Sequence, residues 1–126
     1  MSPDDTFGFG TLYICISFTI GCMTEYKLAI TTCPADEAYK LAKVIAESRK
    51  AACVNIIENV HSIFHWKGNL ETSRESILML KTLEEHLKEL QAVVEESHSY
   101  EVPEFVVVDI ESGAKAYLEW ISDVVG

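Results

Sequence analysis

Two side chains of this sequence, a histidine and a cysteine, have the chemistry of metal ligands. His98 lies in the segment SHSY, shortly before Pro103, and Cys33 lies at the end of the first predicted strand. Imidazole is the commonest metal ligand in proteins, and thiolate sulfur favours soft ions such as copper. The alternative is that His98 fixes the loop before Pro103 and that Cys33 is only a small residue at a helix start.

Charged and aromatic side chains near the same elements indicate a second kind of site. Lys81 and Glu75 fall on one face of a predicted strand, and Glu104 begins the last strand. Lysine and glutamate are rarely buried unpaired, so we expect Lys81 to pair with Glu104, or with Glu75 of another subunit. With Tyr100 and Trp66 nearby, these charges would either organise an interface or bind a small anionic ligand in a cleft.

The composition narrows the class of function. The chain has 126 residues, of which 48% are hydrophobic, and this is typical of one globular domain. Its formal net charge of −10 repels phosphate backbones, so nucleic acid is not expected as a partner. The sequence lacks a phosphate-binding glycine loop, a nucleophile elbow and an HEXXH motif, so we expect no enzyme activity. The four cysteines form no CXXC pair, which favours the reducing cytoplasm.

The start of the chain differs from the rest. Residues 7–23 form an apolar run without a charge. This run is shorter than the roughly 20 residues of a transmembrane helix, and no basic segment precedes it as in a secretory signal. We therefore expect residues 1–23 to be a non-native or disordered extension and residues 24–126 to form the domain. The alternative for this run is a weak membrane anchor.

Hydrophobic periodicity predicts the elements that position the candidate site. The predicted strands are residues 26–32, 51–66, 71–81 and 104–110, and the predicted helices are residues 35–49, a helix after Thr82 and a last short helix from Ser112. Thr82 and Glu85 have the spacing of a capping box, in which Thr82 would be the N-cap. The order β-α-β-β-α-β with a terminal helix predicts an α+β, ferredoxin-like fold.

The two strands around Gly68 form an unusually long hairpin, with a bulge expected near Glu58 and Asn59. Such a hairpin extends beyond a domain of this size and exposes its edges. An exposed strand edge is a liability unless another chain covers it. The sequence therefore predicts an oligomer.

Five strings, in this order, resemble the CutA divalent-cation tolerance family over residues 26–125. They are AACVNII (51–57), SIFHWKG (62–68), residues 75–82, HSYEVPE (98–104) and YLEWI (117–121). The resemblance implies a homotrimer with an architecture like that of PII-type nitrogen-regulatory proteins. It also implies that the protein binds copper(II) or another divalent cation and acts in metal tolerance without being an enzyme.

The chain departs from the family pattern at the proposed copper ligands. Some relatives carry two adjacent histidines before Pro-Tyr, where this chain has only His98 before Ser99, and Cys33 aligns only after a small shift. The chain therefore offers at most two of those three groups.

Two alternatives for the function stay open. One is a PII-like signalling module that binds a small anionic ligand or a partner protein in the cleft between subunits, and the other is a purely structural trimer.

Overall fold

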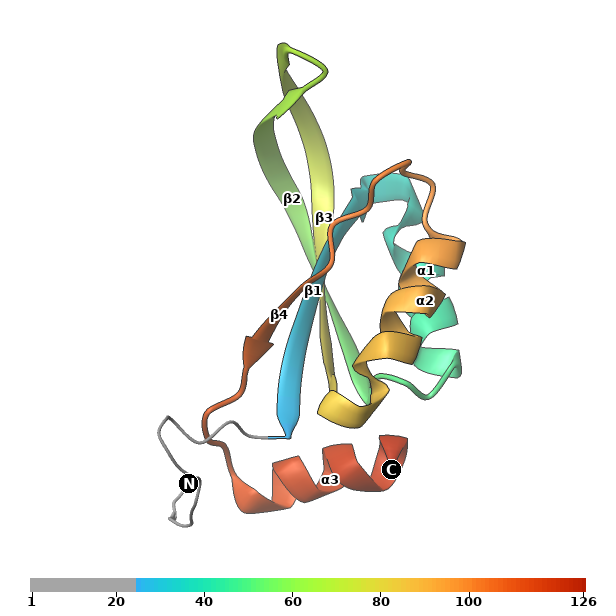
Figure 1. The fold of residues 1–126 in the computed structure, drawn as a ribbon, viewed down its shortest axis with the longest axis vertical. Coiled ribbons are helices and arrows are strands. Elements are labelled where there is room, and N and C mark those ends of the chain that lie inside the picture. Colours follow the sequence, from blue (N-terminus) through green and yellow to red (C-terminus); the bar gives the residue numbers. More distant parts are fainter. Residues whose placement is uncertain (1–24) are drawn as a thin grey trace.

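Four strands form one antiparallel sheet in the order β2-β3-β1-β4 (Figure 1). The computed structural model of the protein describes residues 25–126. The strands are β1 (Tyr26–Pro34), β2 (Cys53–Trp66), β3 (Asn69–Leu83) and β4 (Val106–Asp109), and the helices are α1 (Ala38–Glu47), α2 (Leu87–Ser97) and α3 (Lys115–Val125), with 3-10 turns η2 (Ala35–Glu37) and η3 (Glu84–His86) before α1 and α2. This arrangement confirms the predicted ferredoxin-like fold.

Helices α1 and α2 lie side by side on one face of the sheet (Figure 1). Side chains alternate between the two faces of a strand, so every second residue of β1 and β3 points into this layer. Leu78 and Leu80 of β3 are fully buried there against Ile45 of α1 and Leu90 of α2. Each such side chain contributes about 1.5–3 kcal/mol by leaving water. This core holds the sheet in the register that places the site.

Among residues 25–126, no helix lies over the centre of the opposite face of the sheet (Figure 1). We call it the open face, and its apolar residues are Leu28, Ile30, Ile57, Ile77, Met79, Val106 and Val108. Ile57 is 44% exposed and Val106 is 49% exposed, although both are apolar. Helix α3 covers only one end of this face, where Ile121 packs against Leu83 and the Tyr26 hydroxyl contacts Ser122 Oγ at 2.8 Å. A contiguous apolar surface of this kind marks an interaction site.

Strands β2 and β3 continue beyond the rest of the sheet as a two-stranded ribbon (Figure 1). Strand β1 pairs with β3 only from Glu75 onward, so residues 61–74 form this ribbon, and no third strand among the described residues pairs with it. The register shifts between Ile57 and Val60, and Asn59 has a φ of 62°. The predicted bulge is confirmed. The ribbon closes at Lys67 and Gly68, whose positive φ values of 49° and 83° suit a two-residue hairpin turn.

The predicted capping box is wrong. Thr82 belongs to β3, and its hydroxyl donates a hydrogen bond to the carbonyl oxygen of Lys50 at 2.5 Å. The residue that precedes η3 is Leu83, and no side-chain cap bond forms there. The threonine is fully buried, so its hydroxyl bonds to the carbonyl oxygen of Lys50, in the segment between α1 and β2, instead of capping the following helix.

The strands also extend further than the periodicity predicts. This holds for β1, which runs on to Pro34, and for β3, which covers residues 69–83. By contrast, β2 begins two residues later than predicted, at Cys53, and β4 is shorter than predicted, at Val106–Asp109. No helix among residues 25–126 is long and apolar enough to cross a membrane. The apolar run at residues 7–23 lies outside the described residues, and so does the expected domain boundary.

Lys27 is a buried charge that sequence reasoning missed. Its ammonium group forms ion pairs with Asp109 of β4 and with Glu84 of η3, the second at 3.4 Å. A lysine is almost never buried without such partners. The three charges therefore join β4 and the start of the second helical segment to β1.

Candidate functional site

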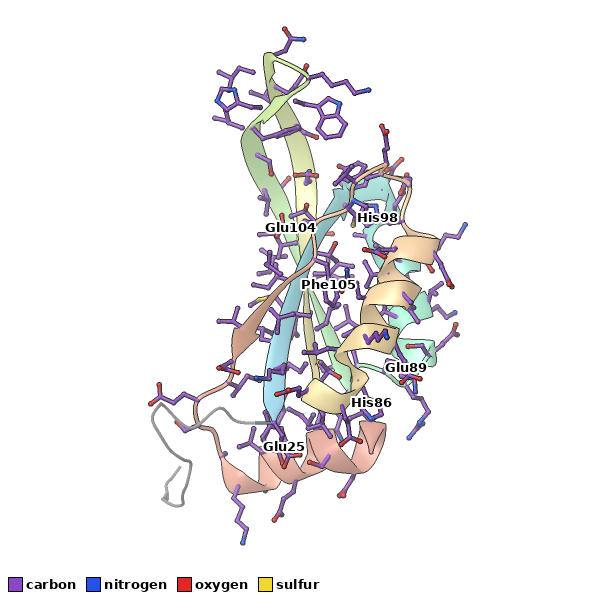
Figure 2. The ribbon with its side chains drawn as sticks, viewed as in Figure 1. Glu25, His86, Glu89, His98, Glu104 and Phe105 are labelled. Carbon is purple, nitrogen blue, oxygen red and sulfur yellow. The ribbon has the colours of Figure 1, made fainter. Side chains whose placement is uncertain are left out.

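The loop from His98 to Glu104 connects α2 to β4 and passes the end of β1 (Figures 1 and 2). The backbone N–H of Tyr100 donates to Nδ1 of His98 at 3.1 Å. Because Nδ1 accepts this bond, Nε2 carries the ring proton and donates to the carbonyl oxygen of Thr32 at 2.6 Å. Both ring nitrogens are therefore engaged, and His98 fixes the loop to β1.

Cys33 lies one residue further along β1 and is fully buried in the helix-covered core. Burial, with the nearby carboxylates of Glu37, Glu75 and Asp36, raises the pKa of its thiol to about 11. The thiolate is the form that binds metals, so this cysteine is held in the wrong protonation state for a ligand at neutral pH.

The contacts of His98 and Cys33 are unfavourable for the metal site predicted from these two residues. A metal at His98 would have to break one of its two hydrogen bonds, and Cys33 would have to lose a proton in the core. Among residues 25–126, no three histidine, cysteine or acidic side chains lie close enough to hold a metal ion. In the described conformation the pair does not fit a copper ion, and His98 matches the loop-fixing alternative.

Tyr100 and Glu75 form the inner end of a second feature, a cavity beside this loop. Glu75 lies on β3 opposite Pro34, where β1 ends, and only 5% of it is exposed. The Tyr100 hydroxyl donates to Glu75 Oε2 at 2.6 Å. Burial and the adjacent carboxylate raise the pKa of Tyr100, so the phenol remains a donor. This bond joins the loop to the base of the ribbon.

The cavity itself has a volume of about 500 Å³. We call it the acidic cavity, because its lining within the described part of the chain has four glutamates and no basic residue. Its lining comes from β1, the ribbon and the loop, and consists of Thr32, Ser62, Phe64, Trp66, Glu71, Glu75, Tyr100, Glu101, Val102 and Glu104. Four of the five residues predicted for a ligand cleft, namely Trp66, Glu75, Tyr100 and Glu104, lie together here.

Strand alternation explains why acidic and aromatic side chains meet in the cavity. Ser62, Phe64 and Trp66 share one face of β2, and Glu71 lies directly opposite Phe64 in the register. From the other side, Glu104 is held near Thr32, whose hydroxyl donates to Glu104 Oε1 at 3.5 Å. Figure 2 shows Glu104 where the loop meets the sheet.

Sequence reasoning missed two of the cavity's four glutamates, Glu71 and Glu101. Glu71 and Glu75 are four residues apart on one strand, so period-two alternation alone places them on one face. Glu71 could therefore have been found from the sequence. Glu101 lies in an irregular loop, where no periodicity tells which way a side chain points.

Lys81 is not part of this site. In the register it lies between Leu28 and Cys53, six residues, or about 20 Å, along β3 from Glu75. Its ammonium group donates to the Tyr117 hydroxyl at 3.2 Å and lies 5.4 Å from the centre of that ring. The predicted pairing with Glu104 within one chain is therefore wrong, because the two residues lie at opposite ends of β1. Pairing with Glu75 of another subunit stays a prediction.

Residues 27–124 match the family described as CutA1 divalent ion tolerance protein. The chain belongs to the CutA1 family. The matched residues include β2, β3, β4, all of β1 except Tyr26 and both helices of the core, as well as all the residues that line the acidic cavity. The sequence-based resemblance is thus confirmed.

Curated relatives agree with this assignment. A CutA homolog of Xenopus laevis is 42% identical over 98 residues, which are 77% of this chain and 65% of that protein. The divalent-cation tolerance protein CutA of Thermus thermophilus is 36% identical over 101 residues, 79% of this chain and 98% of that protein. The match spans only 55% of the mouse protein CutA. The CutA1 domain is therefore the part that this chain shares with its animal relatives.

Solved CutA structures have the same fold. CutA from Xylella fastidiosa superposes with a TM-score of 0.78 at 30% identity, covering 82% of this chain and 100% of that chain. The PII-like protein CutA from Nostoc sp. PCC 7120 gives a TM-score of 0.75 at 31% identity, with 79% and 97% covered. The predicted PII-like architecture of the CutA1 chain is thereby confirmed at the level of the subunit.

Proposed function

We propose that this CutA1 protein is a homotrimer that binds divalent cations and acts in cation tolerance as a binding protein, without enzyme activity. The observation that carries the proposal is the acidic cavity, which lies where the ribbon leaves the body of the sheet and beside its open face. A ligand there would be bound at the boundary between subunits.

The surface of a single chain supports the assembly. Ile57, Val106 and Val108 on the open face are each more than two fifths exposed. A two-stranded ribbon is marginal by itself in water, and its free edges can pair with other chains. Copies of the chain would bury the open faces and support the ribbons at the same time. The number three rests on the family resemblance.

The charge of the cavity supports a cation. Among residues 25–126, no lysine or arginine forms an ion pair with any of its four glutamates. Uncompensated carboxylates in a hollow raise the local concentration of cations. Carboxylate oxygens suit hard ions such as Mn²⁺, Mg²⁺ and Ca²⁺. Because one chain does not bring three of them together, we expect the neighbouring subunit to supply further donors.

Copper(II) at Cys33 and His98 stays a separate, family-derived prediction. It requires the His98 ring to leave Thr32 or Tyr100 and the buried thiol to ionise. The cavity also gives no support to the small anionic ligand considered from the sequence, because its lining holds only negative charges.

Calorimetric titration of chelator-treated protein with MnCl2, and separately with CuCl2, tests the cation site. The double variant Glu71→Gln/Glu104→Gln should weaken Mn²⁺ binding at least about tenfold, which is roughly the effect of one lost charged contact. The control is Glu95→Gln/Glu96→Gln, which removes two exposed carboxylates from α2. Unchanged Mn²⁺ binding in the cavity variant would contradict the proposal, and copper binding lost in Cys33→Ser and His98→Ala would place the metal in the other site.

A further inference from the structure

We infer that the acidic cavity binds a small organic cation, a molecule in which an ammonium group is attached to an apolar body. The inference goes beyond divalent-cation binding, since the ligand is of another chemical class. It rests on the proposed function only in expecting a neighbouring subunit to close the outer side of the cavity. The observation behind it is that three aromatic rings and four carboxylates line the same cavity.

The aromatic side of the cavity is formed by Phe64 and Trp66 of the ribbon and by Tyr100 of the loop. The face of an aromatic ring carries partial negative charge and attracts a cation within about 6 Å of its centre. Trp66 already has one such neighbour, because the Lys67 ammonium group lies 5.6 Å from its ring. Lys67 is not among the residues that line the cavity.

The carboxylates supply the charge that an ammonium group needs. Glu75 is almost fully buried at the inner end, and its Oε2 already accepts the Tyr100 hydroxyl. A carboxylate has about four acceptor positions, so this bond leaves room for an N–H donor from a ligand. Glu71 lies opposite Phe64, which places a second carboxylate beside a ring. Hydrogen bonds between ionised groups are about twice as strong as neutral ones.

The spacing of the donors favours an organic cation over a bare ion in the single-chain cavity. A calcium ion needs about six to eight oxygens within 2.6 Å, and the described residues bring no such set together. A volume of about 500 Å³ with an apolar wall instead matches the usual size of small-molecule sites. A bulky, weakly hydrated cation can touch the rings and the separated carboxylates at once.

The test uses tert-butylammonium chloride as the probe and tert-butanol as its uncharged counterpart of the same shape. Full-length protein in excess chelator is titrated with each, and the methyl NMR signal of the added compound is followed, so that binding can be measured in every variant. We expect a saturable response to the ammonium compound with a Kd on the order of 1 mM, as befits so small a ligand. An equal response to tert-butanol would overturn the inference, because the charge would then have no part in binding.

Variants assign the response to the cavity. Glu75→Gln should weaken binding about tenfold, through the lost charge, and Trp66→Leu about fivefold, through the lost ring face. Tyr39→Ala is the control, since Tyr39 is an aromatic residue of α1 that is 78% exposed. If Glu75→Gln fails to fold, Glu71→Gln, which changes an exposed carboxylate of the same cavity, takes its place with a smaller expected loss. Binding unaffected by the cavity variants, or lost equally in Tyr39→Ala, would refute the inference.

The titrations with tert-butylammonium and with Mn²⁺ test the inference and the proposed function separately. A response to tert-butylammonium without any Mn²⁺ binding would remove the divalent-cation proposal and keep the inference. Mn²⁺ binding in the cavity without a response to the ammonium compound would do the reverse.

Discussion

The two faces of the sheet are made from alternate residues of the same strands, but within residues 25–126 only one of them is covered by two helices. Leu78 and Leu80 of β3 are fully buried under α1 and α2. Ile77 and Met79, their neighbours in sequence, point to the open face and stay half-buried. The difference teaches that the stability of the single chain comes from one face, whereas the other face stays open and carries the acidic cavity; this is the face that the proposed assembly would cover.

A second comparison holds along the open face. Its ribbon end is acidic, with Glu71, Glu75 and the loop glutamates around a hollow. Its other end has Lys81, which lies against the ring of Tyr117 on α3. Charges of opposite sign are therefore separated along β3. A neighbouring copy in the right orientation could bring them together, as the predicted pairing between Lys81 and Glu75 of two subunits requires.

If the helix-covered face is the main core, truncating one of its residues should have the largest effect on stability. Leu80→Ala should lower the free energy of unfolding by about 2–5 kcal/mol, because it removes buried methyl groups and leaves a cavity. Urea unfolding at a fixed protein concentration measures this change. A loss below about 1 kcal/mol would mean that the helix-covered face is not the main core.

A charge on the adjacent residue should act on assembly instead. Met79→Glu places a carboxylate on the open face, where burial between subunits would cost several kcal/mol. We expect the variant to keep its circular dichroism spectrum and to lose its oligomeric state in light scattering. Tyr39→Glu, on the solvent side of α1, is the matched control. Retention of the wild-type mass by Met79→Glu would show that the open face is not an interface.

The protonation of Cys33 makes the stability of the core depend on pH. The pKa of the folded thiol is about 11, above the usual value of 9.0. The unfolded chain therefore loses this proton first, and the stabilising contribution is full below pH 9 and disappears as the pH rises to about 11. The loss attributable to this group should be on the order of 2 kcal/mol. Unfolding of wild type and Cys33→Ala between pH 8 and 11 measures it, and identical slopes would contradict the assignment.

The smallest effect is expected at the loop that passes the end of β1. Tyr100→Phe removes the hydroxyl that donates to Glu75 and should destabilise the protein by about 1 kcal/mol. Tyr39→Phe, which changes an exposed phenol, should have no effect on thermal or urea unfolding. A destabilisation equal to that of Leu80→Ala would mean that the loop belongs to the core instead of covering its edge.

Local patterns predicted most of the fold because the features behind them are local. The stripe of Leu41 and Ile45, the alternation along β3 and the bulge at Asn59 all follow from the period of the chain itself. The role of Thr82 did not follow, because its partner, the Lys50 carbonyl oxygen, is brought near only by the folded sheet.

For the candidate site, the sequence indicated several of the residues but not the contacts that they make. Trp66, Glu75, Tyr100 and Glu104 do share one cavity. The partner of His98, however, is the carbonyl oxygen of Thr32, which lies 66 residues away in the sequence, and no sequence motif predicts such a contact. For Lys81 the face was predicted correctly but the pairing with Glu104 within one chain was not, because alternation gives the side of a strand to which a residue points and not which distant residue lies beside it.

The most direct test of the central claim, that copies of this chain cover one another's open faces, is the mass of the full-length protein in solution. Light scattering during size exclusion at micromolar concentration should give three times the chain mass of 14.1 kDa. A compact, folded species of one chain mass would contradict the assembly and, with it, the placement of the acidic cavity between subunits.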